Sequence, residues 1–370
     1  MTVYESRYIA CIHDENSLDY QGWEIRVEEV GHNPAHTGGT DYRNARHTPI
    51  VRFQNGWSPN GAIPLPEDYA DFATRCANFV RNSQGCSVWV IGNECNHGSE
   101  WPHGQPITPD LYARCYDMCW QEIHELPGHE NDQVIVGAIA PYNAQTKYPG
   151  NANGDWALYL EHILNRCRYV DGVALHAYSS NQQPNIIISD AKMGPPFGHL
   201  SSEFRTYRDQ MNAIPESLYG KPVYLTEMNP GARGVPWQNA NTGWVRAAYD
   251  EIARWNAQHY GREIRCAALY CWDRRGDGMW IQDKPGVLDD FKAAAARGLE
   301  WAHEPPIDPP GPEPPDPPAP VPAECQFSEA VVRRVVREEM AALYAELREA
   351  MVEEIRQALN NTMWLAKVKE

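Results

Sequence analysis

Short apolar segments alternate with longer amphipathic ones through most of the chain. The short segments predict eight β-strands, at residues 8–13, 24–30, 49–53, 87–92, 134–140, 172–176, 222–227 and 264–272. Segments with apolar residues three and four apart predict helices between the later strands, at 66–82, 109–124, 156–167, 202–213, 244–259 and 287–302. Strands that alternate with helices form a parallel sheet, and eight such units close into a (β/α)8 TIM barrel.

Two local features qualify this pattern. Little helix is predicted in the first two units, since residues 14–22 are short and residues 31–47 form a loop rich in Gly, His and Asn. The predicted helix at 202–213 opens with Ser201 and Ser202, which are the candidate caps of its first turn.

The composition changes sharply after residue 303. Residues 304–326 are dominated by proline, which has no amide hydrogen, and are expected to form an extended spacer. Residues 327–370 show one apolar stripe at spacings of three and four, which predicts a long amphipathic or coiled-coil helix. The predicted organisation is therefore a barrel at 1–303, a linker at 304–326 and a helical segment at 327–370. The stripe favours a homo-oligomer over docking of the helix onto the barrel.

Charge and composition narrow the classes of partner. A net charge of −17 without a basic stripe argues against nucleic acid as a partner. The chain contains no apolar run long enough for a transmembrane helix and no start typical of a secretory signal, so a cytoplasmic location is the default expectation, although a spacer and stalk also suit a surface-attached enzyme. The ten cysteines lie mostly in apolar patterns without metal-ligand spacing, so buried free thiols are expected, with no metal and no cofactor.

Two glutamates at strand ends are the main candidates for chemistry. Glu94 follows the apolar strand at 87–92, and Glu227 ends the strand at 222–227. The fourth and seventh strands lie on opposite sides of an eight-stranded ring, so these carboxylates are expected to face each other across the barrel mouth. A carboxylate pair about 5 to 5.5 Å apart is what retaining glycoside hydrolysis requires.

The residues around both glutamates resemble the clan A glycoside hydrolases. Gly92-Asn93-Glu94 is similar to the acid/base signature of that clan, and Leu225-Thr226-Glu227 is similar to its nucleophile strand. The resemblance implies that Glu94 is the general acid/base, that Glu227 is the nucleophile and that Asn93 holds the 2-hydroxyl of the sugar.

Other strand ends extend the resemblance. His176 and Tyr178 form a His-x-Tyr motif, in which the clan's Tyr hydrogen-bonds the nucleophile and its His lines the site. Trp272 ends the eighth strand, where clan members commonly have a Trp that floors the first subsite. Arg52 departs from the pattern, because the clan's arginine near the nucleophile usually follows strand two, whereas Arg52 lies on strand three by this strand count. An arginine beside a carboxylate lowers its pKa, so Arg52 remains a candidate.

Loops at the same barrel face supply further candidates for sugar binding or specificity. These are His13, Asp14, Asn55, Trp57, Asn96, His97, Trp101, Tyr142, Asn143, Asn229 and Trp237.

The sequence thus predicts retaining hydrolysis of β-glycosidic bonds in an oligo- or polysaccharide. One alternative is a non-catalytic, multivalent carbohydrate-binding protein on the same scaffold. Another is a metal-dependent hydrolase that uses His13, Asp14 and His176, although such a site needs a fuller ligand set.

Overall fold

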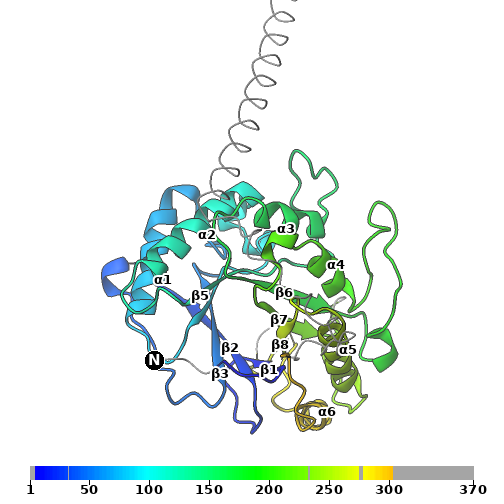
Figure 1. Ribbon diagram of the computed structural model, residues 1–370. Helices are drawn as coiled ribbons and strands as arrows, with labels where there is room; N and C mark the ends of the chain where they lie inside the picture. Colours follow the sequence, from blue (N-terminus) through cyan, green and yellow to red (C-terminus); the bar gives the residue numbers. More distant parts are fainter. Residues whose placement is uncertain (1–4, 32, 232–233, 275–277, 303–370) are drawn as a thin grey trace, which may run out of the picture. The chain divides into compact units, whose positions relative to one another are not determined.

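The computed structural model describes residues 5–31, 33–231, 234–274 and 278–302, and eight parallel strands close into one barrel in chain order (Figure 1). The TIM barrel predicted from the sequence is confirmed. The strands are β1 (Ala10–His13), β2 (Trp23–Glu29), β3 (Thr48–Gln54), β4 (Val88–Ile91), β5 (Gln133–Val136), β6 (Gly172–Tyr178), β7 (Val223–Asn229) and β8 (Ile264–Leu269).

Helices surround the barrel from β3 onward (Figure 1). They are α1 (Tyr69–Arg81), α2 (Pro109–His124), α3 (Trp156–Leu164), α4 (Thr206–Asn212), α5 (Trp244–Gln258) and α6 (Pro285–Ala295). In the described part, β1 and β2 are followed by loops, with only a short 3-10 helix at Pro34–His36 before β3. The predicted lack of helix in the first two units is therefore confirmed.

Several predicted boundaries need correction. The helix predicted at 202–213 is shorter, because α4 begins at Thr206 with Arg205 at the N-cap and no side-chain cap. Ser202 does not cap it, since its hydroxyl donates to the carbonyl of Ala191 instead. The fifth and eighth strands end at Val136 and Leu269, four and three residues short of the predicted ends, and the segments that follow them turn into loops at the barrel mouth.

The apolar side chains form two cores, one inside the barrel and one between the strands and the surrounding helices. The buried members of the inner core include Trp23, Ile50, Val90 and Tyr224, and Trp23 meets Tyr224 edge to face at 5.6 Å. A filled interior of this kind leaves no channel, so chemistry is confined to the ends of the strands. Truncating Trp23 to alanine is expected to cost about 3–5 kcal/mol of stability.

A bulge in β7 decides which way Glu227 points. Leu225 pairs with Leu175 of β6, but the next pair is Glu227 with His176, so Thr226 is an extra residue on β7. The pairing of β7 with β8 shifts in the same stretch. Side chains alternate along a strand, so an unbulged strand that buries Tyr224 in the barrel would turn Glu227 outward. The extra residue instead brings Glu227 to the inner side, level with His176.

The cysteines and the helices of the described part can be compared with the expectations from the sequence. The nine cysteines of the described part are free thiols, and eight are buried while Cys167 is half-buried, as expected. No helix in this part is long and apolar enough to cross a membrane. The linker predicted at 304–326 and the helix predicted at 327–370 lie outside the described residues.

Candidate active site

Glu94 lies in a tight turn directly after β4. Gly92 has φ 72° and Glu94 has φ 39°, a left-handed conformation that is uncommon for a residue with a side chain and often marks a functional site. The turn is held on both sides, since Gly92 N donates to Phe53 O and Glu94 N donates to Ala138 O. Gly137 allows the close approach, because a Cβ there would lie 2.4 Å from Ile91 O.

Glu227 is held from the neighbouring strand ends. Arg52 on β3 donates from Nη1 to Glu227 Oε1 at 2.6 Å and to Asn93 Oδ1 at 2.8 Å. The side chains of Arg52 and Glu227 are 3% and 7% exposed, so this ion pair is largely shielded from water. The strand count was correct, and an arginine on strand three reaches the carboxylate.

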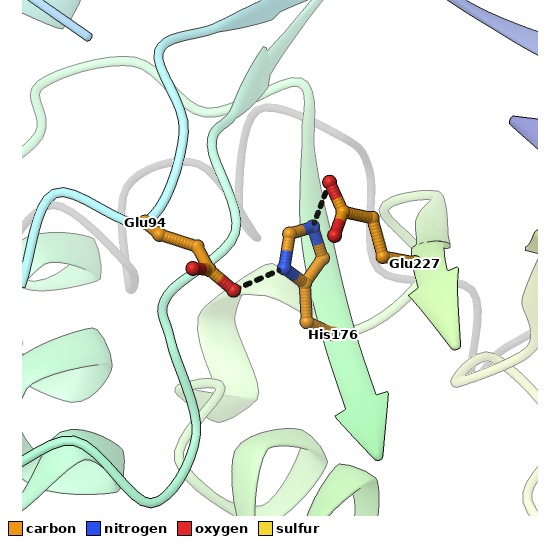
Figure 2. Close-up of side chains that lie close together, drawn as sticks. All are labelled: Glu94, His176 and Glu227. Atoms are coloured by element: carbon orange, nitrogen blue, oxygen red, sulfur yellow. Dashed lines mark hydrogen bonds and ion pairs between the residues drawn. The ribbon is translucent and has the colours of Figure 1, made fainter. Parts of the chain in front are cut away.

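His176 and Tyr178 both contact the two glutamates. Figure 2 shows the His176 ring between the carboxylates, with Nδ1 2.7 Å from Glu94 Oε1 and Nε2 3.7 Å from Glu227 Oε1. The Tyr178 hydroxyl lies 3.1 Å from Glu94 Oε1 and 2.9 Å from Glu227 Oε2. Oxygens of the two carboxylates approach within 4.8 Å of each other. The pair predicted from the sequence therefore meets at one point of the barrel mouth.

The backbone behind this pair is anchored by side chains. Gln210 of α4 donates to the carbonyl of His176 at 2.7 Å. The hydroxyl of Tyr142, in the loop after β5, lies 2.9 Å from the carbonyl of Tyr178 and 2.7 Å from that of Glu203, and its one hydrogen is shared between them. These bonds fix the end of β6 and so fix the imidazole and phenol between the carboxylates.

The two glutamates occupy different electrostatic environments. Burial alone would raise the pKa of Glu227, but His176, Arg52 and His13 outweigh it and lower that pKa to about 2. Arg52 is the permanent part of this effect, because a guanidinium stays charged whereas an imidazole is charged only when protonated. Glu94 has more contact with solvent, with 17% of its side chain exposed against 7% for Glu227. Burial, together with both carboxylates, raises the pKa of Tyr178, which therefore keeps its proton and donates it.

His13, at the end of β1, is a further neighbour of Glu227. Its Nε2 lies 3.7 Å from Glu227 Oε1, and its Nδ1 is 2.9 Å from Asp14 Oδ1. Burial lowers the pKa of His13 although Asp14 opposes the effect, so the neutral imidazole is favoured near neutral pH. With Asp14 bonded to the far nitrogen, the ligand set considered for a metal-dependent hydrolase does not converge on one point.

Glu94, His176 and Glu227 together present three atoms of the kind that bind metals, all within 4.8 Å of one another. The imidazole nevertheless lies between the carboxylates and turns a different nitrogen toward each (Figure 2). Only one of these nitrogens can bind a given ion, so the ring would have to rotate before both carboxylates shared that ion. The arrangement fits hydrogen bonding between the carboxylates better than metal coordination.

Asn93 and an unpredicted glutamate extend the site. Asn93 accepts from Arg52 through Oδ1 and donates through Nδ2 to Glu100 Oε1 at 3.4 Å. Gln54, two residues after Arg52 on β3, donates to Glu100 Oε2 at 3.3 Å. Neither Glu100 nor Gln54 was expected at the site from the sequence. The position of Gln54 could have been inferred, because residues two apart on a strand share a face.

Three of the tryptophans expected near the sugar differ in exposure to solvent. Trp272 is 7% exposed and lines a cavity of about 430 Å³ with Glu24, Arg26, Arg46 and Gln282 among its other walls. Trp57 is 49% exposed in the loop after β3. Trp237 is 3% exposed and its Nε1 donates to the Tyr270 carbonyl, so it has little free face for stacking on a sugar.

The polar loop candidates mainly bond to their own surroundings. Asn229 is buried and accepts from Gly231 N at 2.6 Å. Similar contacts with nearby loop or helix atoms are made by Asn55, Asn96, His97, Trp101 and Asn143. A sequence pattern cannot separate such turn-forming side chains from ones that are free to bind a ligand.

Comparison with known proteins gives a likeness of fold. A glucosidase from Croceicoccus marinus matches with a TM-score of 0.50 and 12% identity over 74% of this chain and 61% of that chain. The barrel shares its fold with glycoside hydrolases. The resemblance to clan A barrel enzymes that the sequence suggested is thus confirmed at the level of fold.

Two further solved structures are similar to the chain. One is a GH128 endo-β-1,3-glucanase from Sorangium cellulosum, with a TM-score of 0.41 and 14% identity over 80% of this chain and 100% of that chain. The other is a family 44 xyloglucanase from Paenibacillus polymyxa, with a TM-score of 0.45 and 9% identity over 78% and 76%. No protein-family model matches the chain, and no curated protein matches it.

Proposed function

We propose that the protein is a retaining β-glycoside hydrolase that acts on an oligo- or polysaccharide, with Glu94 as acid/base and Glu227 as nucleophile. The observation that carries this proposal is the meeting of two carboxylates within 4.8 Å at the barrel mouth, with an arginine bonded to only one of them. Retaining enzymes place their two carboxyl groups about 5–5.5 Å apart, whereas inverting enzymes separate them by about 6.5–9.5 Å. The short separation favours retention.

The first step uses the asymmetry of the pair. Glu227 is ionised because its pKa is lowered to about 2, with the permanently charged Arg52 bonded to it, so its oxygen attacks the anomeric carbon. Glu94 gives its proton to the glycosidic oxygen as that bond breaks, and the alcohol leaves. The sugar is then held on Glu227 as a glycosyl ester, and Glu94 is a carboxylate.

The second step reverses these roles. Glu94 takes a proton from water, the resulting hydroxide oxygen attacks the anomeric carbon, and the bond to Glu227 breaks. Two displacements restore the starting configuration and return both carboxyl groups to their first state. Tyr178 donates to Glu227 Oε2 at 2.9 Å before attack and supports the carboxylate as it leaves the sugar. Asn93 precedes Glu94 in the chain and shares the Arg52 nitrogen with Glu227, and it is the candidate partner for the 2-hydroxyl of the sugar.

The decisive experiment compares wild type, Glu94→Gln and Glu227→Gln on a panel of aryl β-glycosides. Glu161→Gln is the matched control, because Glu161 is exposed on α3. We expect turnover in the wild type and the control and a loss of several orders of magnitude in the two site variants with the melting temperature preserved. A 2-fluoro glycoside with a good leaving group should label Glu227, as located by peptide mass spectrometry.

Product analysis separates the two roles. With azide present, Glu94→Ala is expected to give a β-glycosyl azide, since azide replaces the deprotonated water on the glycosyl-enzyme. Glu227→Ala is expected to give the α-glycosyl azide, because azide then replaces the missing nucleophile. Binding of oligosaccharides without turnover or labelling in the wild type would instead favour the carbohydrate-binding alternative.

A further inference from the structure

A continuous chain of hydrogen bonds leads from Glu227 to a third carboxyl group. Glu227 accepts from Arg52, Asn93 accepts from the same Arg52 nitrogen, and Asn93 then donates to Glu100. Glu100 lies in the 3-10 turn Gly98–Glu100, six residues after Glu94, and touches neither carboxylate of the pair in a hydrogen bond of the described part. The two-step mechanism gives it no role.

The backbone holds Glu100 firmly in this position. Ala62 N donates to the Glu100 carbonyl at 3.0 Å, and Glu100 N donates to the His97 carbonyl at 3.0 Å. Gln54 has a second acceptor in the Gly56 carbonyl at 3.2 Å, which fixes the orientation of the amide that reaches Glu100. A side chain anchored through both its backbone and its partners suits the support of a site rather than contact with a mobile ligand.

Both oxygens of Glu100 face amide N–H groups. Oε1 accepts from Asn93 Nδ2 and Oε2 accepts from Gln54 Nε2, at 3.4 and 3.3 Å. The amide of Asn93 cannot turn around without loss, because its oxygen already accepts from Arg52. Protonation of Glu100 would turn one carboxylate oxygen into a hydroxyl, which is a poorer acceptor, opposite an amide donor, so the ionised carboxylate makes the stronger pair of bonds.

We propose, on the basis of the glycosidase function above, that Glu100 is a positioning residue, whose carboxylate orients Asn93 and, through it, the Arg52 guanidinium on Glu227. Asn93 then presents a fixed amide to the sugar, and Arg52 keeps one nitrogen on Glu227 Oε1. A variant of Glu100 that loses the hydrogen bond to Asn93 should lose about 2- to 10-fold in kcat/KM, which is the contribution of a single hydrogen bond.

The electrostatic setting makes this role depend on pH. Burial raises the pKa of Glu100 to about 7, with Arg52 opposing and Glu94 and Glu227 adding to the rise. The thiol of Cys95 is a further ionisable neighbour, whose own pKa is raised by burial and by Glu100. The orienting form of Glu100 is therefore gained as the pH passes through about 7.

The test is a double-mutant cycle with Glu100→Gln, Asn93→Ala and the double variant, and with Glu161→Gln as control. The glutamine side chain in Glu100→Gln would turn its own N–H toward one of the two amide donors, Asn93 or Gln54, and so imitates protonated Glu100. The wild type is expected to gain activity as Glu100 ionises near pH 7. We expect kcat/KM of Glu100→Gln at pH 8 to fall by about 3- to 10-fold and this rise near pH 7 to disappear. On the Asn93→Ala background, Glu100→Gln should have no further effect, because Glu100 acts through Asn93. Equal losses on both backgrounds, or an unchanged pH profile, would overturn the proposal.

A second readout needs no turnover and so separates this proposal from the glycosidase assignment. The folded protein keeps the Glu100 proton up to about pH 7, whereas the ordinary pKa is 4.5, so wild type loses stability as the pH rises through this window. The melting temperature of Glu100→Gln relative to wild type should therefore rise between pH 5 and pH 8, and the four proteins of the cycle should be non-additive at pH 8. Absence of covalent labelling on Glu227 in the wild type would refute the glycosidase assignment alone. A flat difference in melting temperature with additive effects would refute the role of Glu100 whatever the labelling result.

Discussion

Replacement of Arg52 tests the electrostatic account of the nucleophile. Arg52→Met removes a cation bonded to Glu227 Oε1 at 2.6 Å in a setting where both side chains are less than 10% exposed. Two unit charges about 4 Å apart interact by about 4 kcal/mol at an effective dielectric constant of 20, which corresponds to about 3 pKa units. Arginine neighbours typically lower a carboxyl pKa by about 1–3 units. From its value of about 2, the pKa of Glu227 is expected to rise to between about 3 and 5.

The assay is the rate of covalent inactivation by a 2-fluoro glycoside with an activated leaving group, measured from pH 3 to pH 7. Such a leaving group needs no proton from Glu94, so the acid limb reports the ionisation of Glu227. Arg52→Lys keeps the charge and should shift the limb less than Arg52→Met. Arg75→Met is the matched control, because Arg75 is also 3% exposed but bonds Asp71 and Asn55 on α1 and its neighbouring loop. An acid limb that stays in place in Arg52→Met, with the protein folded, would refute the reasoning.

Three further outcomes are expected. Tyr178→Phe should lower kcat/KM by about 10- to 100-fold with little change in melting temperature, because a hydrogen bond to a carboxylate is worth about 1.5–3 kcal/mol. A loss below twofold would mean that the phenol does not support Glu227. Dialysis against a chelator should leave turnover unchanged, and a loss that added metal restores would favour the metal-dependent alternative. Glu251→Gln should lower the free energy of unfolding, measured in urea, by about 3 kcal/mol, because the fully buried Glu251 carboxylate binds Arg205, Arg208 and Arg254. The folded variant should still be labelled on Glu227. An unchanged urea midpoint would show that this ion-pair cluster adds nothing to stability.

The sequence alone determined the order of elements and the strand ends that form the site. Apolar runs of strand length between amphipathic segments specify a parallel barrel, and the carboxyl ends of parallel strands all lie at one face. Glu94, His176, Tyr178 and Glu227 could therefore be assigned to one mouth from their positions in the chain. Arg52 was correctly placed on strand three by the same count, although the resemblance to clan A pointed to strand two.

The tertiary structure decided which side chains face one another. The extra Thr226 in β7 turns Glu227 inward, and a bulge of this kind depends on pairing with both neighbouring strands, which a hydrophobic pattern does not record. The contact of Glu100 with Asn93 also joins a loop turn to the segment after a strand, so it cannot be predicted from the local hydrophobic pattern. Conversely, Trp237 and Asn229 looked suitable for a sugar, yet the fold uses their polar atoms to bond its own backbone. Local patterns fix where the chain is extended or helical, whereas the partners of a polar side chain depend on atoms that are distant in sequence and meet only when the barrel closes.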